Sequence, residues 1–275
     1  MVTVTFIRHG QSEDNTRDVW AGWKDAPLSA LGRRQAQALA ESMSNTPYTH
    51  IYASDLKRAH DTGKAVHTAL PSPKPPFTVT PLAREQYFGD AEGHKWAISI
   101  PPDTTREALH AQNIFPVYYE RHEKFPNGES LDDLRERAVD AIRQCVLPHL
   151  DSDEGHVAIA SHGLCISEMM GALVSLDPEA DQTVSYRGLL NTAWTRVHVQ
   201  RRESERNTAD DALPVLEVKV ERFNHADHLD GLEDTKEAEQ QGSSEARAYF
   251  GGKIKDASVT NAHIEVEATP QTEKL

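Results

Sequence analysis

The sequence predicts an α/β fold, a three-layer α/β/α sandwich around a mostly parallel central sheet. Three observations lead to this fold class. Runs of β-branched and aromatic residues alternate with amphipathic helical patterns from Val2 to Val174, which is typical of a parallel sheet covered by helices on both faces. Two of these runs end in a polar turn that contains a histidine, as expected where strands end at a ligand site. The chain has 275 residues and only two cysteines, so its core is large enough to form without a disulfide framework.

The first part of the chain consists of short elements with clear boundaries. Ser29 precedes a helical pattern and is a suitable N-cap. The prolines between Pro71 and Pro76 must end the second helix, because proline lacks the amide donor and clashes with the preceding turn. The predicted elements are strands at 2–7, 50–54 and 77–80 and helices at 29–43 and 56–70.

A long segment at 83–127 has no regular period. Its glycine and proline breaks predict an excursion over one face of the domain, and such segments often carry function. Regularity returns at Ser130, which with Asp133 resembles a capping box for an amphipathic helix that runs to Cys145. The remaining predictions are a strand at 156–160, a helix at 164–174, an antiparallel pair at 194–199 and 216–223, and a mobile hairpin tip at 201–212.

The composition changes near the end of the chain. Residues 230–275 are acidic and rich in glutamine, serine, alanine and glycine, with little to bury, which predicts disorder. We therefore expect one folded domain at 1–229 and an acidic disordered C-terminal tail at 230–275. The tail is given no catalytic role.

Charge and hydropathy exclude several classes of protein. The chain carries 29 Lys and Arg against 43 Asp and Glu, a net charge of −14, whereas a general nucleic-acid binder carries a basic face. No apolar run approaches the ~20 residues of a membrane-spanning helix, and the first residues lack the features of a secretory signal. Cys145 and Cys165 lie in apolar helical patterns, which predicts inert buried thiols in a reducing compartment. We expect a cytoplasmic protein, with the nucleus as the alternative, that binds neither nucleic acid nor membranes.

Two histidine turns give the first indication of chemistry. Arg8-His9-Gly10 and Ser161-His162-Gly163 each follow a predicted strand. Because ligands bind beyond the carboxyl ends of parallel strands, both histidines are expected at one edge of the sheet.

Six segments together resemble the histidine phosphatase superfamily, also called the phosphoglycerate mutase-like fold. The resemblance spans about Thr3 to Leu229. One Arg-His-Gly match would occur by chance, whereas six segments in the order of the family are specific. They are Arg8-His9-Gly10-Gln11-Ser12 with Asn15, Gly22-Trp23-Lys24-Asp25-Ala26-Pro27-Leu28-Ser29 with Gly32, Ser54-Asp55-Leu56-Lys57-Arg58-Ala59, Leu82-Ala83-Arg84-Glu85 with Tyr87-Phe88-Gly89-Asp90-Ala91-Glu92-Gly93, Pro126-Asn127-Gly128-Glu129-Ser130, and Ser161-His162-Gly163.

The resemblance implies catalytic roles for five side chains. His9 would be the nucleophile that takes up the phosphoryl group as a phosphohistidine, a role that suits a neutral imidazole. Arg8 and Arg58 would bind the phosphoryl oxygens, because guanidinium donors match phosphate and stay charged. His162, cationic or hydrogen-bonding, would stabilise developing charge. Glu85 would protonate the leaving alkoxide and then deprotonate the attacking water.

The same positions also allow less specific interpretations. Without the resemblance to the family, Arg58 would be interpreted as an exposed helix residue and Glu85 as a solvated glutamate in a loop. Asn15 is implied to donate its side-chain amide to the phosphoryl oxygens, although an ordinary turn or capping asparagine fits nearly as well. Gly22 and Gly163, which lie in matching segments, complete the predicted substrate-binding set.

No metal or cofactor is expected. The pairs His60–His67 and His225–His228 have helical spacing, but no cysteine or acidic set with ligand-like spacing accompanies them, and the family chemistry needs no metal. Asn224 and His228-Leu229 resemble a late family segment that closes the sheet edge, which predicts a packing role.

Three functions remain open: a phosphomonoesterase, a sugar-phosphate mutase, and a non-catalytic interaction module. Mutases of the family have a tyrosine and a lysine after the acid/base residue, where this chain has Phe88 and Trp96, although Lys95 lies beside the second position. A non-catalytic interaction module would be expected to have lost at least one charged residue of the site, and all of them are present here. These comparisons favour a phosphatase of phosphorylated small molecules, whose specificity would be determined by residues 83–125.

Overall fold

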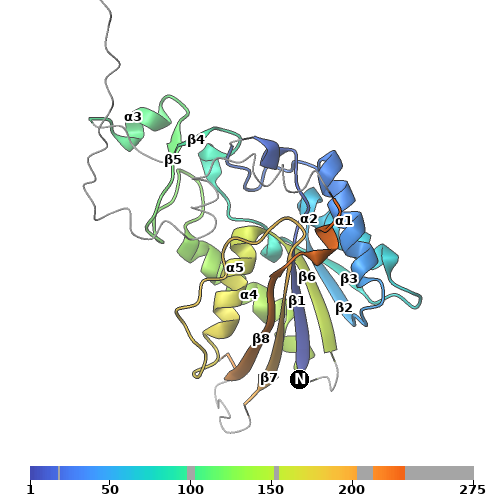
Figure 1. Cartoon of the computed structure of the whole chain (residues 1–275). Helices are drawn as coiled ribbons and strands as arrows, with labels where there is room; N and C mark the ends of the chain where they lie inside the picture. Colours follow the sequence, from blue (N-terminus) through green and yellow to red (C-terminus); the bar gives the residue numbers. More distant parts are fainter. Residues whose placement is uncertain (18, 98–102, 152–154, 203–212, 233–275) are drawn as a thin grey trace, which may run out of the picture.

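The central sheet has six strands in the order β3-β2-β6-β1-β7-β8 (Figure 1). The computed structural model describes residues 1–17, 19–97, 103–151, 155–202 and 213–232. The strands of this sheet are β1 (Val2–Arg8), β2 (His50–Ser54), β3 (Phe77–Thr80), β6 (Gly155–Ser161), β7 (Trp194–Arg201) and β8 (Leu216–His225).

Most of the sheet is parallel, as predicted. β1 pairs with β6, β6 with β2, and β2 with β3, all in parallel, whereas β7 is antiparallel to both β1 and β8. The predicted antiparallel pair near the end of the domain is therefore confirmed. In the register of β1 and β6, Arg8 lies opposite Ser161. The two histidine turns consequently begin side by side at the carboxyl ends of neighbouring strands.

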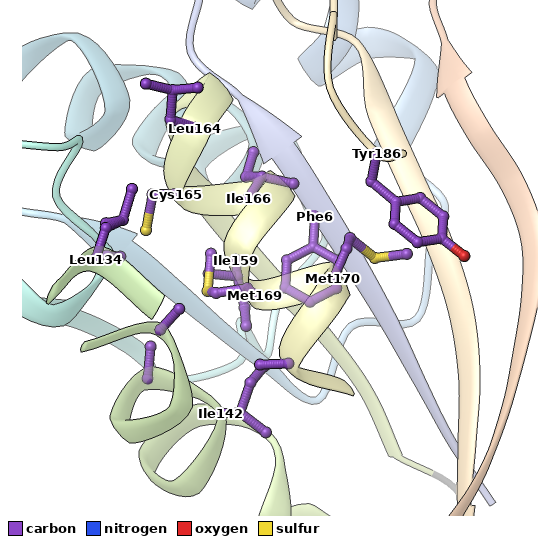
Figure 2. Close-up of a cluster of buried hydrophobic side chains, with 14 of the residues drawn as sticks. Phe6, Leu134, Ile142, Ile159, Leu164, Cys165, Ile166, Met169, Met170 and Tyr186 are labelled. Atoms are coloured by element: carbon purple, nitrogen blue, oxygen red, sulfur yellow. The ribbon is translucent and has the colours of Figure 1, made fainter. Parts of the chain in front are cut away.

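Helices cover both faces of the sheet and complete the three predicted layers (Figure 1). α1 (Ala30–Met43) and α2 (Lys57–Ala69) pack together on one face, and α4 (Leu131–Cys145) and α5 (Gly163–Val174) pack together on the other. Because side chains alternate along a strand, β1 contributes to both cores. Phe6 lies in the cluster beneath α4 and α5, as Figure 2 shows, and Ile7 lies in the cluster beneath α1 and α2.

Side-chain caps determine where two of the helices begin. The Ser29 hydroxyl accepts a hydrogen bond from Gly32 N at 3.0 Å, which places the first turn of α1 where the sequence predicts it. Ser130 and Asp133 form the predicted capping box of α4, with each side chain accepting from the backbone N–H of the other. These caps satisfy amide donors that have no partner within the helix.

The segment between β3 and α4 is the predicted excursion. It contains only short elements, namely β4 (Trp96–Ala97), α3 (Arg106–His110), β5 (Phe115–Pro116) and the 3₁₀ turns η2 (Pro81–Ala83) and η3 (Gly89–Ala91). Aromatic rings hold it to the domain: Trp20 lies 4.7 Å from Phe88 and 5.0 Å from Phe125 between ring centroids, and its indole N–H donates to Phe115 O at 3.1 Å. We call Trp20, Phe88, Phe115 and Phe125 the aromatic base of the excursion.

The remaining 3₁₀ turns are η1 (Asp14–Thr16), η4 (Leu147–His149) and η5 (Asp227–Leu229). Cys145 and Cys165 are buried and not disulfide-bonded, as predicted. None of the helices that the structure describes is long and apolar enough to cross a membrane. Most of the predicted hairpin tip, at 203–212, and most of the predicted tail, at 233–275, lie outside the described residues.

Candidate active site

The peptide unit between His9 and Gly10 is held from both sides. His9 N donates to Ser161 O at 3.0 Å. The His9 carbonyl accepts from Thr192 N at 3.2 Å and from the Asn191 side-chain amide at 3.1 Å. On the other side, Gly10 N donates to the Thr62 hydroxyl at 3.1 Å. These bonds join the end of β1 to β6, to α2 and to the loop before β7.

The His9 imidazole is presented in one tautomer. Its ring is buried, and Nδ1 lies 2.7 Å from Gly10 O. A carbonyl oxygen can only accept, so Nδ1 carries the proton and Nε2 keeps its lone pair. Burial, followed by the charges of Arg58 and Arg8, holds the pKa of His9 well below its ordinary value. At neutral pH the ring is therefore neutral, as a nucleophile requires.

His162 lies beside His9 and is fully buried. The two ring centroids are 5.0 Å apart. Nε2 of His162 lies 3.0 Å from the Ser54 hydroxyl, while Nδ1 has no hydrogen-bond partner among the described residues. Burial, then the nearby Arg58 and His9, hold the pKa of His162 well below its ordinary value. Of the two forms that the sequence leaves open for His162, the structure favours the neutral, hydrogen-bonding one.

Arg58 projects from the first turn of α2 and is 1% exposed, so its interpretation as an exposed helix residue is wrong. Nη2 donates to Gly22 O at 2.7 Å and Nη1 to Lys24 O at 3.1 Å. Burial lowers the pKa of Arg58, and nearby carboxylates, with Glu85 first among them, oppose that shift. A guanidinium keeps its charge even so, and the two carbonyls fix its plane beside the histidines.

The Glu85 carboxylate lies at the beginning of α5. Oε1 accepts from Gln86 N at 2.9 Å and from Cys165 N at 3.1 Å, and Oε2 accepts from Leu164 N at 3.2 Å. It thereby satisfies two amide donors of the first turn of α5, where a negative charge is favoured. Glu85 is half-buried, so its interpretation as a solvated glutamate in a loop is wrong.

Gly163 lies between the predicted acid/base and one of the predicted arginines. A Cβ at this position would be 3.7 Å from Arg8 Nε and 4.0 Å from Glu85 Oε2. The Arg8 guanidinium also donates through Nη1 to Leu189 O. The structure therefore brings Arg8, Glu85 and His162 together around the N-terminus of α5. His9 joins this group beside His162, and the charge of Arg58 lowers the pKa of both histidines.

Two of the predicted substrate-binding residues have partners within the protein. Asn15 is exposed, and its Oδ1 accepts from Ser12 N at 3.0 Å, which leaves its amide nitrogen as the outward donor. Gly22 has a φ of +48°, and its carbonyl is directed to Arg58. Their contact with substrate stays a prediction, as does that of Gly163.

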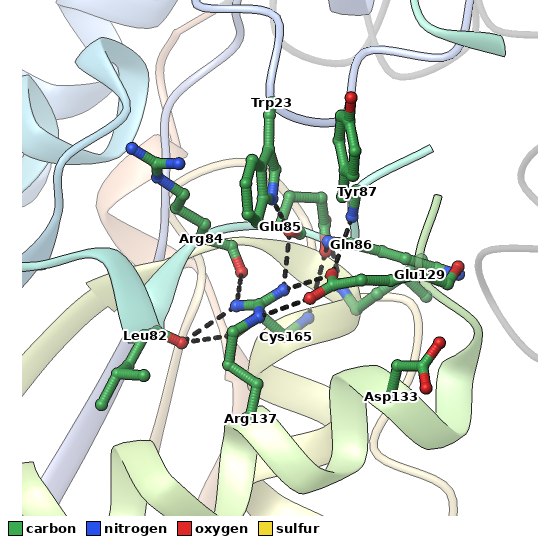
Figure 3. Close-up of polar contacts among 12 residues, drawn as sticks. Trp23, Leu82, Arg84, Glu85, Gln86, Tyr87, Glu129, Asp133, Arg137 and Cys165 are labelled. Atoms are coloured by element: carbon green, nitrogen blue, oxygen red, sulfur yellow. Dashed lines mark hydrogen bonds and ion pairs between the residues drawn. The ribbon is translucent and has the colours of Figure 1, made fainter. Parts of the chain in front are cut away.

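The segment from Leu82 to Tyr87, which carries Glu85, is fixed by α4 (Figure 3). Arg137 donates to the carbonyls of Leu82 and Glu85 and pairs with Glu129 at 2.7 Å. Trp23 donates its indole N–H to Glu85 O at 2.7 Å. Glu129 and Trp23 lie in segments that match the family pattern, but the sequence alone indicates no role for either of them or for Arg137.

A sequence signal for Arg137 exists. It follows Leu134 by three positions and precedes Ala141 by four, so it falls on the apolar stripe of the helix. A charged residue at such a position needs a buried partner. Thr62 and Ser54, which contact Gly10 and His162, carry no comparable signal because small polar residues are common in buried helices and strand ends.

The histidine pairs singled out in the sequence lie among the described residues. Among the residues that the structure describes, no group of three or more histidine, cysteine or acidic side chains could hold a metal ion. His228 lies 2.9 Å from the Thr192 hydroxyl, and Asn224 accepts from Leu190 N and donates to Gly188 O. These contacts fit the predicted packing role.

Comparison with known proteins gives a consistent family. The model of the histidine phosphatase superfamily (branch 1) matches residues 4–211. The chain is 28% identical over 187 residues to 2,3-bisphosphoglycerate-dependent phosphoglycerate mutase 2 of Gloeobacter violaceus, covering 67% of this chain and 81% of that protein. It is also 28% identical over 226 residues to a probable phosphoglycerate mutase GpmB of Yersinia enterocolitica, covering 79% and 98%.

Solved structures share the fold. A protein described as mycobacterial hydrolase 1 superposes with a TM-score of 0.63 at 24% identity, covering 82% of this chain and 99% of that one. A mycobacterial glucosyl-3-phosphoglycerate phosphatase in complex with VO3 superposes with a TM-score of 0.59 at 24% identity, covering 81% and 98%.

Proposed function

The chain belongs to the histidine phosphatase superfamily (branch 1), and from this membership we propose that it hydrolyses phosphate monoesters of small molecules through a phosphohistidine on His9. One observation carries the proposal. The Gly10 carbonyl fixes the proton of His9 on Nδ1, and burial keeps the ring neutral, so Nε2 is a prepared nucleophile.

In the first step, Nε2 of His9 attacks the phosphorus atom and the bond from phosphorus to the ester oxygen breaks. Glu85, protonated, gives its proton to the departing oxygen, so an alcohol leaves and the carboxylate remains. Arg8 and Arg58 stabilise the negative oxygens of the phosphoryl group. The open Nδ1 position of His162 suits a further hydrogen bond to one of those oxygens.

In the second step, water breaks the phosphohistidine. The Glu85 carboxylate takes a proton from the water as its oxygen attacks phosphorus, and the bond from nitrogen to phosphorus breaks. Inorganic phosphate leaves, His9 recovers its lone pair, and Glu85 is again protonated. Water is the only co-reactant that the two steps require besides the ester.

Two features support hydrolysis over transfer to a second hydroxyl. The Phe88 ring is 5% exposed and packs on Trp20, so it offers no hydroxyl to a second acidic group. Arg84 forms two hydrogen bonds with Asp55, and Arg137 pairs with Glu129. A carboxylate therefore already neutralises the charge of each guanidinium, which makes both weaker partners for a second phosphate. The side chain of Trp96, the residue at the position of the mutase lysine, lies outside the described part of the structure.

A phosphoglycerate mutase activity is the second candidate, because similar proteins carry that name. Both functions are tested by incubating the purified full-length protein with a panel of phosphomonoesters and measuring phosphate release. Conversion of 3- to 2-phosphoglycerate is assayed in parallel. Phosphate release that greatly exceeds conversion supports the phosphatase, whereas conversion without phosphate release refutes it.

His9→Ala tests the nucleophile. We expect it to abolish both turnover and the acid-labile phosphoenzyme that a rapid quench of the wild type would trap. Residual phosphorylation of the His9→Ala protein at the wild-type level would contradict the assignment. Removal of residues 233–275 is expected to leave hydrolysis intact, and a large fall in kcat would instead connect the tail to the site.

A further inference from the structure

We propose that Arg137 and Glu129, on and just before α4, are positioning residues for the general acid Glu85. They hold the backbone on both sides of Glu85 so that its carboxyl group lies at the reacting centre. The inference rests on the proposed function, and its effect is confined to the steps in which Glu85 transfers a proton.

Arg137 holds the backbone before and at Glu85. Its side chain is 13% exposed. Nη1 donates to Leu82 O at 3.0 Å and to Arg84 O at 2.7 Å, and Nη2 donates to Glu85 O at 2.9 Å. These carbonyls follow the end of β3 and lie outside any sheet pairing of that strand. One guanidinium thus fixes three carbonyls within four residues.

Glu129 holds the backbone after Glu85. Its carboxylate accepts from Arg137 Nε at 2.9 Å and from Tyr87 N at 2.9 Å. Its own backbone N donates to Tyr87 O at 2.7 Å, and its carbonyl accepts from the Gln86 side chain at 2.8 Å. Figure 3 shows this arrangement, with the side chains of Glu129 and Arg137 in direct contact beside the segment.

The two halves of Glu85 are therefore held by two different helices. The first turn of α5 binds the carboxylate through Leu164 N and Cys165 N, while Arg137 of α4 binds the carbonyl of the same residue. α4 and α5 pack against each other. A displacement of the backbone would pull the carboxylate away from α5 and away from the departing oxygen.

The charged guanidinium of Arg137 is paired within the protein. Burial alone would lower the pKa of Arg137, but the hydrogen bonds that it donates to Glu129 and nearby negative groups outweigh burial and raise that pKa. The guanidinium stays charged and paired at every pH of interest, so it does not compete with Arg8 and Arg58 for the phosphoryl oxygens. This pairing separates positioning from phosphate binding.

The expected phenotype depends on the leaving group. Proton transfer needs donor and acceptor about 2.6–3.2 Å apart, and a misplacement of about 1 Å can cost on the order of 10²-fold. An alkyl phosphate needs a proton on its departing oxygen, whereas an activated aryl phosphate such as 4-nitrophenyl phosphate leaves without one. We expect Arg137→Gln to lower kcat/KM about 10²-fold for the alkyl ester and less than about 3-fold for the aryl ester.

Arg135→Gln is the matched control. Arg135 lies two positions earlier on α4, pairs with buried Glu168 at 3.0 Å and donates to Glu168 O at 2.7 Å. Within the described part of the chain, the hydrogen bond and the ion pair of Arg135 both go to Glu168 of α5, and neither goes to the segment from Leu82 to Tyr87. Arg135→Gln should lower thermal stability as Arg137→Gln does, while the ratio of alkyl to aryl kcat/KM stays at the wild-type value.

A double-mutant cycle provides the decisive measurement. With the alkyl ester, Glu85→Gln combined with Arg137→Gln should be no slower than Glu85→Gln alone, because no general acid remains to be positioned. Multiplied losses would overturn the proposal, as would an equal loss by Arg137→Gln on both esters or no loss on either. If Arg137→Gln does not fold, Glu129→Gln takes its place, since it keeps an acceptor for Tyr87 N while it removes the ion pair and the acceptor for Arg137 Nε. Wild-type protein that releases no phosphate from any ester refutes the proposed function instead, and so separates the two failures.

Discussion

Thr62→Val removes a hydroxyl that holds the backbone beside His9, the proposed nucleophile. Thr62 is fully buried, and its hydroxyl accepts from Gly10 N at 3.1 Å and donates to Arg58 O at 2.7 Å. Valine has a similar shape, and the Arg58 carbonyl retains its helical partner. The Gly10 amide, in contrast, is left buried without an acceptor. An unsatisfied buried donor costs about 1–3 kcal/mol, which corresponds to a fall in Tm of about 4–8 °C at the middle of that range for a domain of this size.

We expect Thr62→Val to have a smaller effect on catalysis than on folding stability. The His9 carbonyl, on the other side of the same peptide unit, keeps Thr192 N and Asn191 as donors. We therefore expect kcat/KM for an aryl phosphate to fall less than about 10-fold. The assays are thermal unfolding and steady-state hydrolysis with the same protein preparation.

Thr68→Val is the control for this variant. Thr68 lies on the same helix and donates to Lys64 O at 2.7 Å, the same spacing as Thr62 to Arg58, but it is exposed. Its replacement should change stability by less than about 0.5 kcal/mol. Equal Tm values for the two variants would refute the argument that the Gly10 amide depends on Thr62. Complete loss of activity at unchanged stability would refute it as well.

Three further predictions concern other parts of the site and the core. Gly22→Ala should lower stability by about 2 kcal/mol and raise KM, because φ is +48° and a Cβ would lie 2.0 Å from Glu92 Oε1. Thermal unfolding and steady-state kinetics measure the two effects, and an unchanged Tm with an unchanged KM would contradict this prediction. Since burial holds the pKa of His9 well below 6.5, kcat/KM should not decline as the pH falls through 6.5, and a half-loss near that pH would contradict the buried neutral ring. Burial lowers the pKa values of His156 and His228 to about 4. The unfolded chain therefore binds more protons than the folded one below pH 6.5, and stability to urea should fall between pH 6.5 and about 4 by up to about 1.4 kcal/mol per pH unit for each group. A flat urea midpoint over that range would contradict it.

The regular elements could be predicted from the sequence because their determinants are local. Ser29 and Ser130 cap the helices that follow them, and the β-branched runs at 2–7 and 50–54 become β1 and β2 within one residue of the predicted bounds. The excursion could not be folded in the same way, because its aromatic base joins Trp20 to Phe125 across more than a hundred residues. A contact between residues so far apart in the chain leaves no periodic pattern within 83–127 from which it could be predicted.

The site shows the same division between local and non-local information. The turns at His9 and His162 follow strands, so their common edge could be inferred before the structure. The protonation of His162 could not, since it depends on burial between β2 and β6. Arg137 has a recognisable position on its helix, but its target is the backbone of a distant loop, which side-chain patterns do not reveal.

The aromatic base separates the excursion, which is expected to determine substrate preference, from the edge of the central sheet. The predicted phosphoryl-binding residues come from strand ends and helix starts, whereas Trp20, Phe88 and Phe125 hold the excursion to the domain. Under the proposed function, we expect substitutions on the outer surface of the excursion to alter which alcohol is accepted without disturbing the proposed reacting atoms. Laboratory evolution of new ester preferences should therefore begin there and leave the sheet edge untouched.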